Sequence, residues 1–115
     1  MYLYLNEDHV EVCKRAIGTY GAKSQIPIAA EEAAEFIQAL MKTFRYSGEI
    51  PEEVRNHIVE ELADLAIVTT EIRLIFGIVD KELNSVIDRK ISRLASWLDS
   101  SSDQSRTMEE GFRKW

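Results

Sequence analysis

The 115-residue sequence contains only one cysteine and two histidines, the residues from which disulfides and soft-metal sites are built. Cys13 alone cannot form an internal disulfide and has no companion metal ligands, so we expect a core residue in a reducing compartment. No hydrophobic run approaches the ~18 residues of a membrane span, and the start of the chain has no signal-peptide pattern. We therefore expect a cytoplasmic protein that does not enter a membrane.

Positive charge is also scarce. Fourteen lysines and arginines stand against 20 acidic residues, which gives a net charge of −6 and a pI of about 4.9. This balance argues against binding to nucleic-acid polymers or to an anionic membrane surface. Small anionic substrates remain compatible with it, because a bound cation reverses the local field. A hydrophobic content of 45% and a charged content of 30% predict one soluble, folded domain.

Glycine and proline are few, with five and two residues, and they divide the chain into four expected helices. Gly21 and Gly77 are expected to end the first and third helices, and Pro51 to open the third. We expect a break at 24–27, with Pro27 in the first turn of the second helix, and a cap at Asp80 for the fourth. The expected helices span about residues 6–20 (capped by Asn6 or Asp8), 27–45, 51–76 and 80–99. No alternating strand pattern competes, so the sequence predicts an all-α four-helix bundle over 1–99 and a polar tail over 100–115.

Six carboxylates interrupt this pattern in two groups: Glu31, Glu32 and Glu35, and then Glu60, Glu61 and Asp64. Both groups lie in segments that otherwise have the pattern of buried amphipathic helix. The expected seam of the third helix consists of Val54, Ile58, Glu61, Leu65, Val68, Ile72 and Ile75. Glu61 is the one residue of this seam that is not aliphatic, and Asp64 lies one turn along and about 60° around the helix, so both can face one point. A buried carboxylate must be paired, protonated or bound to a cation.

The alternative is that these acids lie on solvated helix surfaces, which suits Glu31 and Glu60. The other four have no lysine or arginine three or four residues further along, and their mutual repulsion is costly when desolvated. A bound cation is the simplest compensation. Carboxylate ligands without thiolate or histidine favour Mg²⁺ or Mn²⁺ over zinc, and no Glu-x-x-His pattern of a di-iron bundle is present. Because carboxylate-held Mg²⁺ commonly acts on phosphate groups, the pattern predicts metal-assisted phosphate chemistry.

The order Glu31-Glu32-x-x-Glu35, then Glu61-x-x-Asp64 after a gap, resembles the signature of the all-α NTP pyrophosphatases, the MazG-like superfamily. The resemblance extends from about Tyr20 to Leu98. It is closest to the small, single-domain, phage-associated branch in three phrases: Tyr20-Gly21 with Gln25, Glu60-Glu61-Leu-Ala-Asp64, and Lys90-Ile-Ser-Arg93. Relatives often have an asparagine where this chain has Ser92.

The resemblance implies hydrolysis of a nucleoside or deoxynucleoside triphosphate to the monophosphate and pyrophosphate. It assigns Glu32, Glu35, Glu61 and Asp64 as ligands of Mg²⁺, with Mn²⁺ as a substitute. Glu31 or Glu60 would accept the proton of the attacking water or orient the ligands. The candidate substrate-binding residues are Lys90, Arg93, Gln25 and Lys42.

The resemblance also implies a homodimer or homotetramer. The sequence supports this separately, because Ile67, Leu74 and Phe76 lie off the main seam of the third helix and predict a further packing surface. Two alternative functions remain open. One is a related pyrophosphohydrolase with another substrate, of the phosphoribosyl-ATP type, and the other is a helical oligomer that binds metal and nucleotide without turnover.

Overall fold

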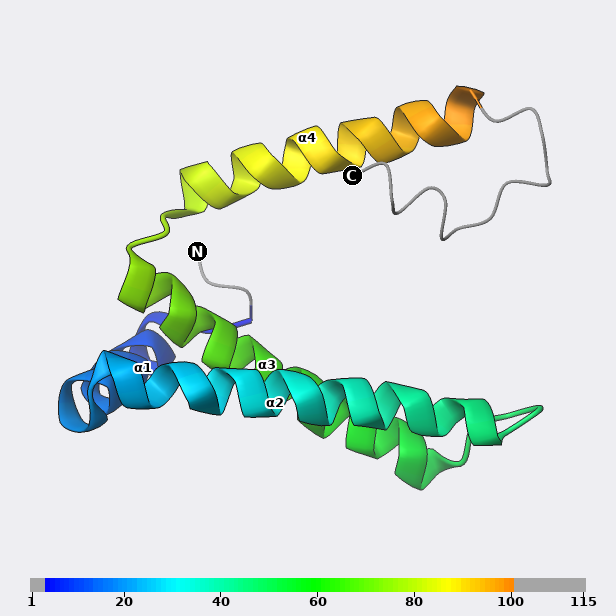
Figure 1. Ribbon diagram of the computed structural model, residues 1–115, viewed down its shortest axis with the longest axis horizontal. Helices are drawn as coiled ribbons and strands as arrows, with labels where there is room; N and C mark the ends of the chain where they lie inside the picture. The colour runs from blue at the N-terminus through cyan, green and yellow to red at the C-terminus, as the bar shows by residue number, and fades with distance from the viewer. Residues whose placement is uncertain (1–3, 101–115) are drawn as a thin grey trace. The chain divides into compact units, whose positions relative to one another are not determined.

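The computed structural model describes residues 4–100 of the chain, and these residues fold into helices (Figure 1). In order, the elements are α1 (Glu7–Tyr20), α2 (Ala22–Lys42), the 3-10 turn η1 (Thr43–Arg45), α3 (Glu52–Phe76) and α4 (Asp80–Ser100). Within 4–100 there is no β-strand, which confirms the all-α prediction. None of the helices in this range is long and apolar enough to cross a membrane. Apart from Ser100, which ends α4, the predicted polar tail lies outside the described residues.

Helix α1 begins and ends where local chemistry predicts. The side-chain oxygen of Asn6 accepts a hydrogen bond from the backbone N–H of His9 at 2.9 Å, and Nδ1 of His9 accepts one from the backbone N–H of Asn6 at 3.2 Å. These two bonds satisfy donors that the first turn of a helix leaves free. Gly21 ends the helix with φ of 86°, and its N–H donates to the Ile17 carbonyl at 2.8 Å. The predicted limits of this helix are confirmed.

The predicted break at 24–27 is wrong. Helix α2 begins at Ala22, directly after Gly21, so a single glycine joins the two helices. The Ser24 hydroxyl lies within hydrogen-bond distance of the Tyr20 carbonyl, at the end of α1, and of the Gly21 carbonyl, which also accepts a bond from the Gln25 N–H at 3.3 Å. Pro27 lies inside α2. The helix accommodates it in its second turn, where the missing N–H removes one backbone hydrogen bond.

The chain divides into two compact units, Met1–Ile78 and Val79–Trp115. In the first unit α2 and α3 lie side by side, and α1 contacts both of them (Figure 1). The described part of the second unit is essentially α4, an amphipathic helix in which no residue is buried.

The α2–α3 contact has small and apolar side chains at its centre. On α2, Ala29 and Ala39 are buried, Ala39 to 1% exposure, and Glu32 lies between them on the same row. On α3 every residue of the predicted seam is buried or half-buried, including Glu61 at 7% exposure. Glu32 of α2 and Glu61 of α3 are therefore placed within the helix pair.

Helix α3 ends as predicted. It begins directly after Pro51, with Glu52 and Glu53 at its positive end. Gly77 follows in the left-handed conformation, with φ of 62° and ψ of 33°, and its N–H donates to the last carbonyls of the helix. A residue with a β-carbon is disfavoured in this conformation, so Gly77 fixes the end of the helix.

Candidate metal centre

Three carboxylates from two helices meet in the first unit. Glu32 of α2 and Glu61 and Asp64 of α3 each offer one oxygen, and these three oxygens lie within 4.8 Å of one another. Glu61 is buried and the other two are half-buried. Oxygens that share one Mg²⁺ at about 2.1 Å lie about 3–4 Å apart. The cluster could therefore hold a metal ion after a small contraction.

Two of the carboxylate oxygens in this cluster lack ordinary partners. Oε2 of Glu32 and Oε2 of Glu61 are buried, and neither has a hydrogen-bond partner in the described part of the chain. A buried polar atom without a partner costs free energy, and a charged one costs more. A divalent cation would satisfy both oxygens at once. The donor set consists of oxygens alone, which fits Mg²⁺ or Mn²⁺.

The electrostatics of the cluster favour proton or cation uptake. Desolvation raises the pKa of Glu32, and the negative charges of Glu35, Asp64 and Glu61 raise it further. A hydrogen bond with Glu35 acts on this pKa in the same direction. The cluster is therefore an acidic site whose ionised form requires compensation by positive charge.

Glu35, the fourth predicted ligand, is exposed and is not one of the three clustered carboxylates. It stays beside the cluster, because its charge and its hydrogen bond both act on Glu32. The structure thus brings three of the predicted ligands together and leaves Glu35 at their edge. Its role as a ligand remains a prediction.

Glu31 and Glu60, the predicted proton acceptors, are both exposed. Oε2 of Glu60 lies 3.9 Å from Nδ1 of His57, and Nε2 of the same ring lies 3.7 Å from Oε1 of Glu61. The sequence does not give His57 the Glu-x-x-His spacing of a di-iron ligand, and its contact with Glu61 was not predicted. The signal was available in its spacing, because a residue four positions before Glu61 lies on the same face of the helix.

The candidate substrate-binding residues occupy three places. Gln25 is buried on α2, at 6% exposure and two turns before Glu32. Lys42 is the last residue of α2, two turns after Glu35. Lys90 and Arg93 lie one turn apart on α4, in the second unit. Their approach to the acids remains a prediction.

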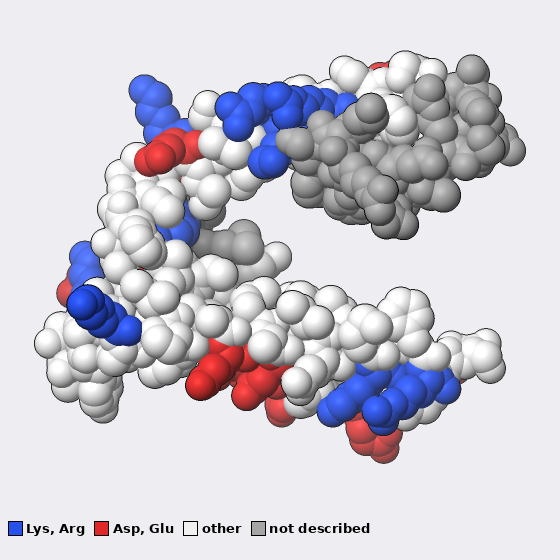
Figure 2. Space-filling view, viewed as in Figure 1, with Lys and Arg blue, Asp and Glu red and all other residues white. Residues whose placement is uncertain are grey.

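The surface of the first unit carries both signs of charge. Figure 2 shows acidic side chains midway along the α2–α3 pair and basic side chains toward the end of α2. Lys42 and Arg45 line a shallow depression there, together with Ile37, Gln38 and Met41. This depression provides positive charge on the same helix that carries Glu32 and Glu35.

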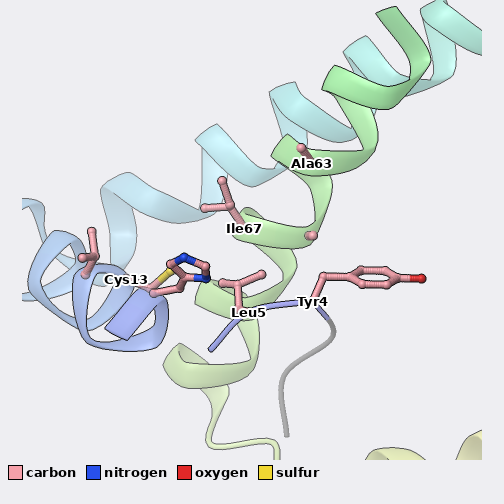
Figure 3. Close-up of a pocket in the computed structure, with 8 residues that line it drawn as sticks. Tyr4, Leu5, Cys13, Ala63 and Ile67 are labelled. Carbon is pink, nitrogen blue, oxygen red and sulfur yellow. The ribbon is translucent and has the colours of Figure 1, made fainter. Parts of the chain in front are cut away.

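A separate apolar pocket of about 360 Å³ lies between the N-terminal segment, α1 and α3. In Figure 3, Leu5 and Cys13 lie on one side of it, Ala63 and Ile67 of α3 lie on the other, and the ring of Tyr4 points away. The remaining lining residues are His9, Val12 and Ala66. None of the six acids lines this pocket, so it is distinct from the candidate metal centre.

Comparison of the chain with protein-family models, curated proteins and solved structures finds no match.

Proposed function

We propose that this chain is a Mg²⁺-dependent pyrophosphohydrolase that converts a nucleoside or deoxynucleoside triphosphate to the monophosphate and pyrophosphate. One observation carries the proposal: carboxylates from two helices converge within 4.8 Å, and two of their buried oxygens, on Glu32 and Glu61, have no hydrogen-bond partner among the described residues. Such a site fits a hard divalent cation, and carboxylate-held Mg²⁺ typically binds phosphate groups. The triphosphate as substrate is what the resemblance of the two acidic motifs to the all-α NTP pyrophosphatases implies.

Glu32, Glu61 and Asp64 would hold the ion, with Glu35 completing the set from the edge of the cluster. Mg²⁺ prefers six ligands, so three or four carboxylates leave positions for water and for phosphate oxygens. When bound, the ion would neutralise charge on the phosphates and acidify a coordinated water. Mn²⁺ fits the same oxygen donors and is expected to substitute.

The remaining residues would act on the substrate and the water. Hydrolysis breaks the anhydride bond between the α and β phosphoryl groups and consumes one water, whose proton Glu31 or Glu60 would accept. Both of these carboxylates are exposed and therefore open to solvent. Lys42, Lys90 and Arg93 would bind the phosphates, and Gln25 would contact the substrate or support the site.

We further propose that the active form is a homodimer or homotetramer. Large apolar side chains remain exposed on the single chain, among them Phe44 at 80% and, on α4, Ile91 at 55% and Leu98 at 63%. Amphipathic helices with exposed apolar faces are typical of subunit contacts. Light scattering at micromolar concentration tests this directly, and a monomer would contradict it.

Pyrophosphate release from a panel of NTPs and dNTPs with Mg²⁺ tests the function. The expected result is release by the wild type, loss in Glu61→Gln, and retention in Glu53→Gln, an exposed acid of the same helix. Release from phosphoribosyl-ATP alone would favour the alternative substrate class. Nucleotide binding without release from any compound, with wild type and Glu61→Gln equal, would favour the non-catalytic alternative.

A further inference from the structure

His57 lies between two carboxylates of its own helix, one exposed and one in the candidate metal centre. Nδ1 of its ring is 3.9 Å from Oε2 of Glu60, and Nε2 is 3.7 Å from Oε1 of Glu61. The Glu60 and His57 side chains are 79% and 42% exposed, whereas that of Glu61 is 9% exposed. The three side chains thus form a row from solvent to the buried carboxylate.

The two oxygens of Glu61 have different surroundings. Oε1 is the atom that faces the His57 ring. Oε2 is buried and has no hydrogen-bond partner within residues 4–100. A carboxylate can rotate about its last side-chain bond, so a contact at one oxygen determines where the other points. The contact with His57 therefore leaves Oε2 as the oxygen available to a cation.

We propose that His57 is a positioning residue of the candidate metal centre: it holds Glu61 through Oε1 so that Oε2 is directed at the bound cation, and Glu60 holds the imidazole from the other side. This inference rests on the proposed metal centre. His57 is not itself a ligand, since the group of clustered ligand atoms consists of Glu32, Glu61 and Asp64. At 3.7 Å, Nε2 of His57 and Oε1 of Glu61 are beyond direct hydrogen-bond distance. The contact is therefore electrostatic or bridged by water. We expect this distance to shorten when the carboxylates contract around an ion.

The geometry of α3 permits this arrangement. Glu60 and Glu61 lie three and four residues after His57, the two spacings at which helical side chains are neighbours. Partners that orient a metal ligand from outside the coordination sphere typically contribute about 10- to 100-fold in metal affinity. The expected effect of removing His57 is therefore weaker binding of the cation, without unfolding of the helix.

Isothermal titration of the nucleotide-free protein with Mn²⁺ tests the inference. We expect His57→Ala to weaken Mn²⁺ binding by about tenfold or more. His57→Gln should restore most of the affinity, because its amide reaches a similar position and donates to Oε1 of Glu61. Asn56→Ala, at an adjacent exposed position, is the matched control and should bind Mn²⁺ like the wild type. Circular dichroism of each variant monitors the fold.

Each outcome either supports or overturns the role of His57 in positioning Glu61. Equal Mn²⁺ affinity in wild type and His57→Ala would overturn the inference, as would a glutamine variant that binds no better than the alanine variant. A wild type that binds no Mn²⁺ would overturn the metal centre and this inference together. A wild type that binds Mn²⁺ in a His57-dependent way, but releases no pyrophosphate, would overturn the proposed function and leave the role of His57 supported.

Discussion

Cys13 of α1 and Glu71 of α3 are electrostatic neighbours in the interior, at 4% and 7% exposure. Burial raises the pKa of the Cys13 thiol, and the negative charge of Glu71 raises it further. Desolvation also raises the pKa of Glu71. The packing of α1 against α3 therefore encloses two titratable groups that both favour their neutral forms.

The raised pKa of Glu71 predicts a loss of stability as the pH rises. In the unfolded chain a glutamate loses its proton near pH 4.5, while folded Glu71 retains it to higher pH. The folded state then binds more protons, so the free energy of unfolding falls as the pH rises from about 4.5 through the raised pKa. Glu71→Gln cannot ionise and should show a smaller fall, which comes from the raised pKa of Glu32. Urea unfolding between pH 4.5 and 7.5 measures the difference between wild type and variant.

Glu49→Gln, at an exposed loop position, is the control for that comparison and should follow the wild-type pH profile. If the unfolding free energies of wild type and Glu71→Gln changed in parallel over this range, burial would not raise the pKa of Glu71 as assigned here.

Magnesium should stabilise the folded chain through the acid cluster. A ligand that binds the native state alone raises the free energy of unfolding by about 2.7 kcal/mol at 100 times its dissociation constant. We expect Mg²⁺ to raise the thermal midpoint of the wild type and EDTA to reverse this. Glu61→Gln should lose most of the shift, and Glu53→Gln should keep it. A shift of the same size in all three proteins would place the bound ion elsewhere.

Removal of a single acid from the cluster should separate activity from stability. Glu32→Ala and Asp64→Ala each delete a proposed ligand, so pyrophosphate release should fall to the background level. Each change also removes repulsion among the clustered carboxylates, so the metal-free variants should be as stable as the wild type or more stable. Denaturant unfolding in EDTA measures this second effect. Marked destabilisation of both metal-free variants would show that the acids hold the helices together in another way.

The left-handed Gly77 makes a prediction about the end of α3. Nothing lies within 4 Å of a β-carbon built at this position, so Gly77→Ala meets no steric neighbour and only the backbone conformation is disfavoured. The expected cost is about 1 kcal/mol in the free energy of unfolding, measured with urea. Gly48→Ala is the control, because Gly48 has no positive φ and equally open space. A variant at Gly77 as stable as the wild type would mean that the end of α3 relaxes.

The ends of a helix were predictable from the sequence where the chemistry of a single residue determines them. Asn6, Gly21, Pro51 and Gly77 each act through their own backbone or side chain, and all four lie where the sequence places them. The break at 24–27 was predicted wrongly because Gly21 and Pro27 both indicate a helix boundary. Gly21 alone forms the turn between α1 and α2, the Ser24 hydroxyl hydrogen-bonds to a carbonyl at this turn, and Pro27 lies inside α2.

The candidate site was partly predictable for a similar reason. Glu61 stood out because it interrupts an aliphatic seam, and its burial follows from that position. The convergence of Glu32 with Asp64 depends on how α2 and α3 pack against each other. Hydrophobic periodicity within one helix cannot predict that packing. Predicting the contact of His57 with Glu61 required both their spacing along α3 and the rotamer of Glu61. That rotamer depends on tertiary packing.

Ala29 and Ala39 have a consequence for the choice of ion. Side chains at a helix contact determine the distance between helix axes, and these two small residues let α2 approach closely on either side of Glu32. Ca²⁺ requires longer bonds to oxygen than Mg²⁺, by about 0.3–0.5 Å. We therefore expect these two methyl groups, rather than the carboxylates alone, to determine which ionic radius the proposed centre accepts, and larger side chains there to shift its preference toward calcium.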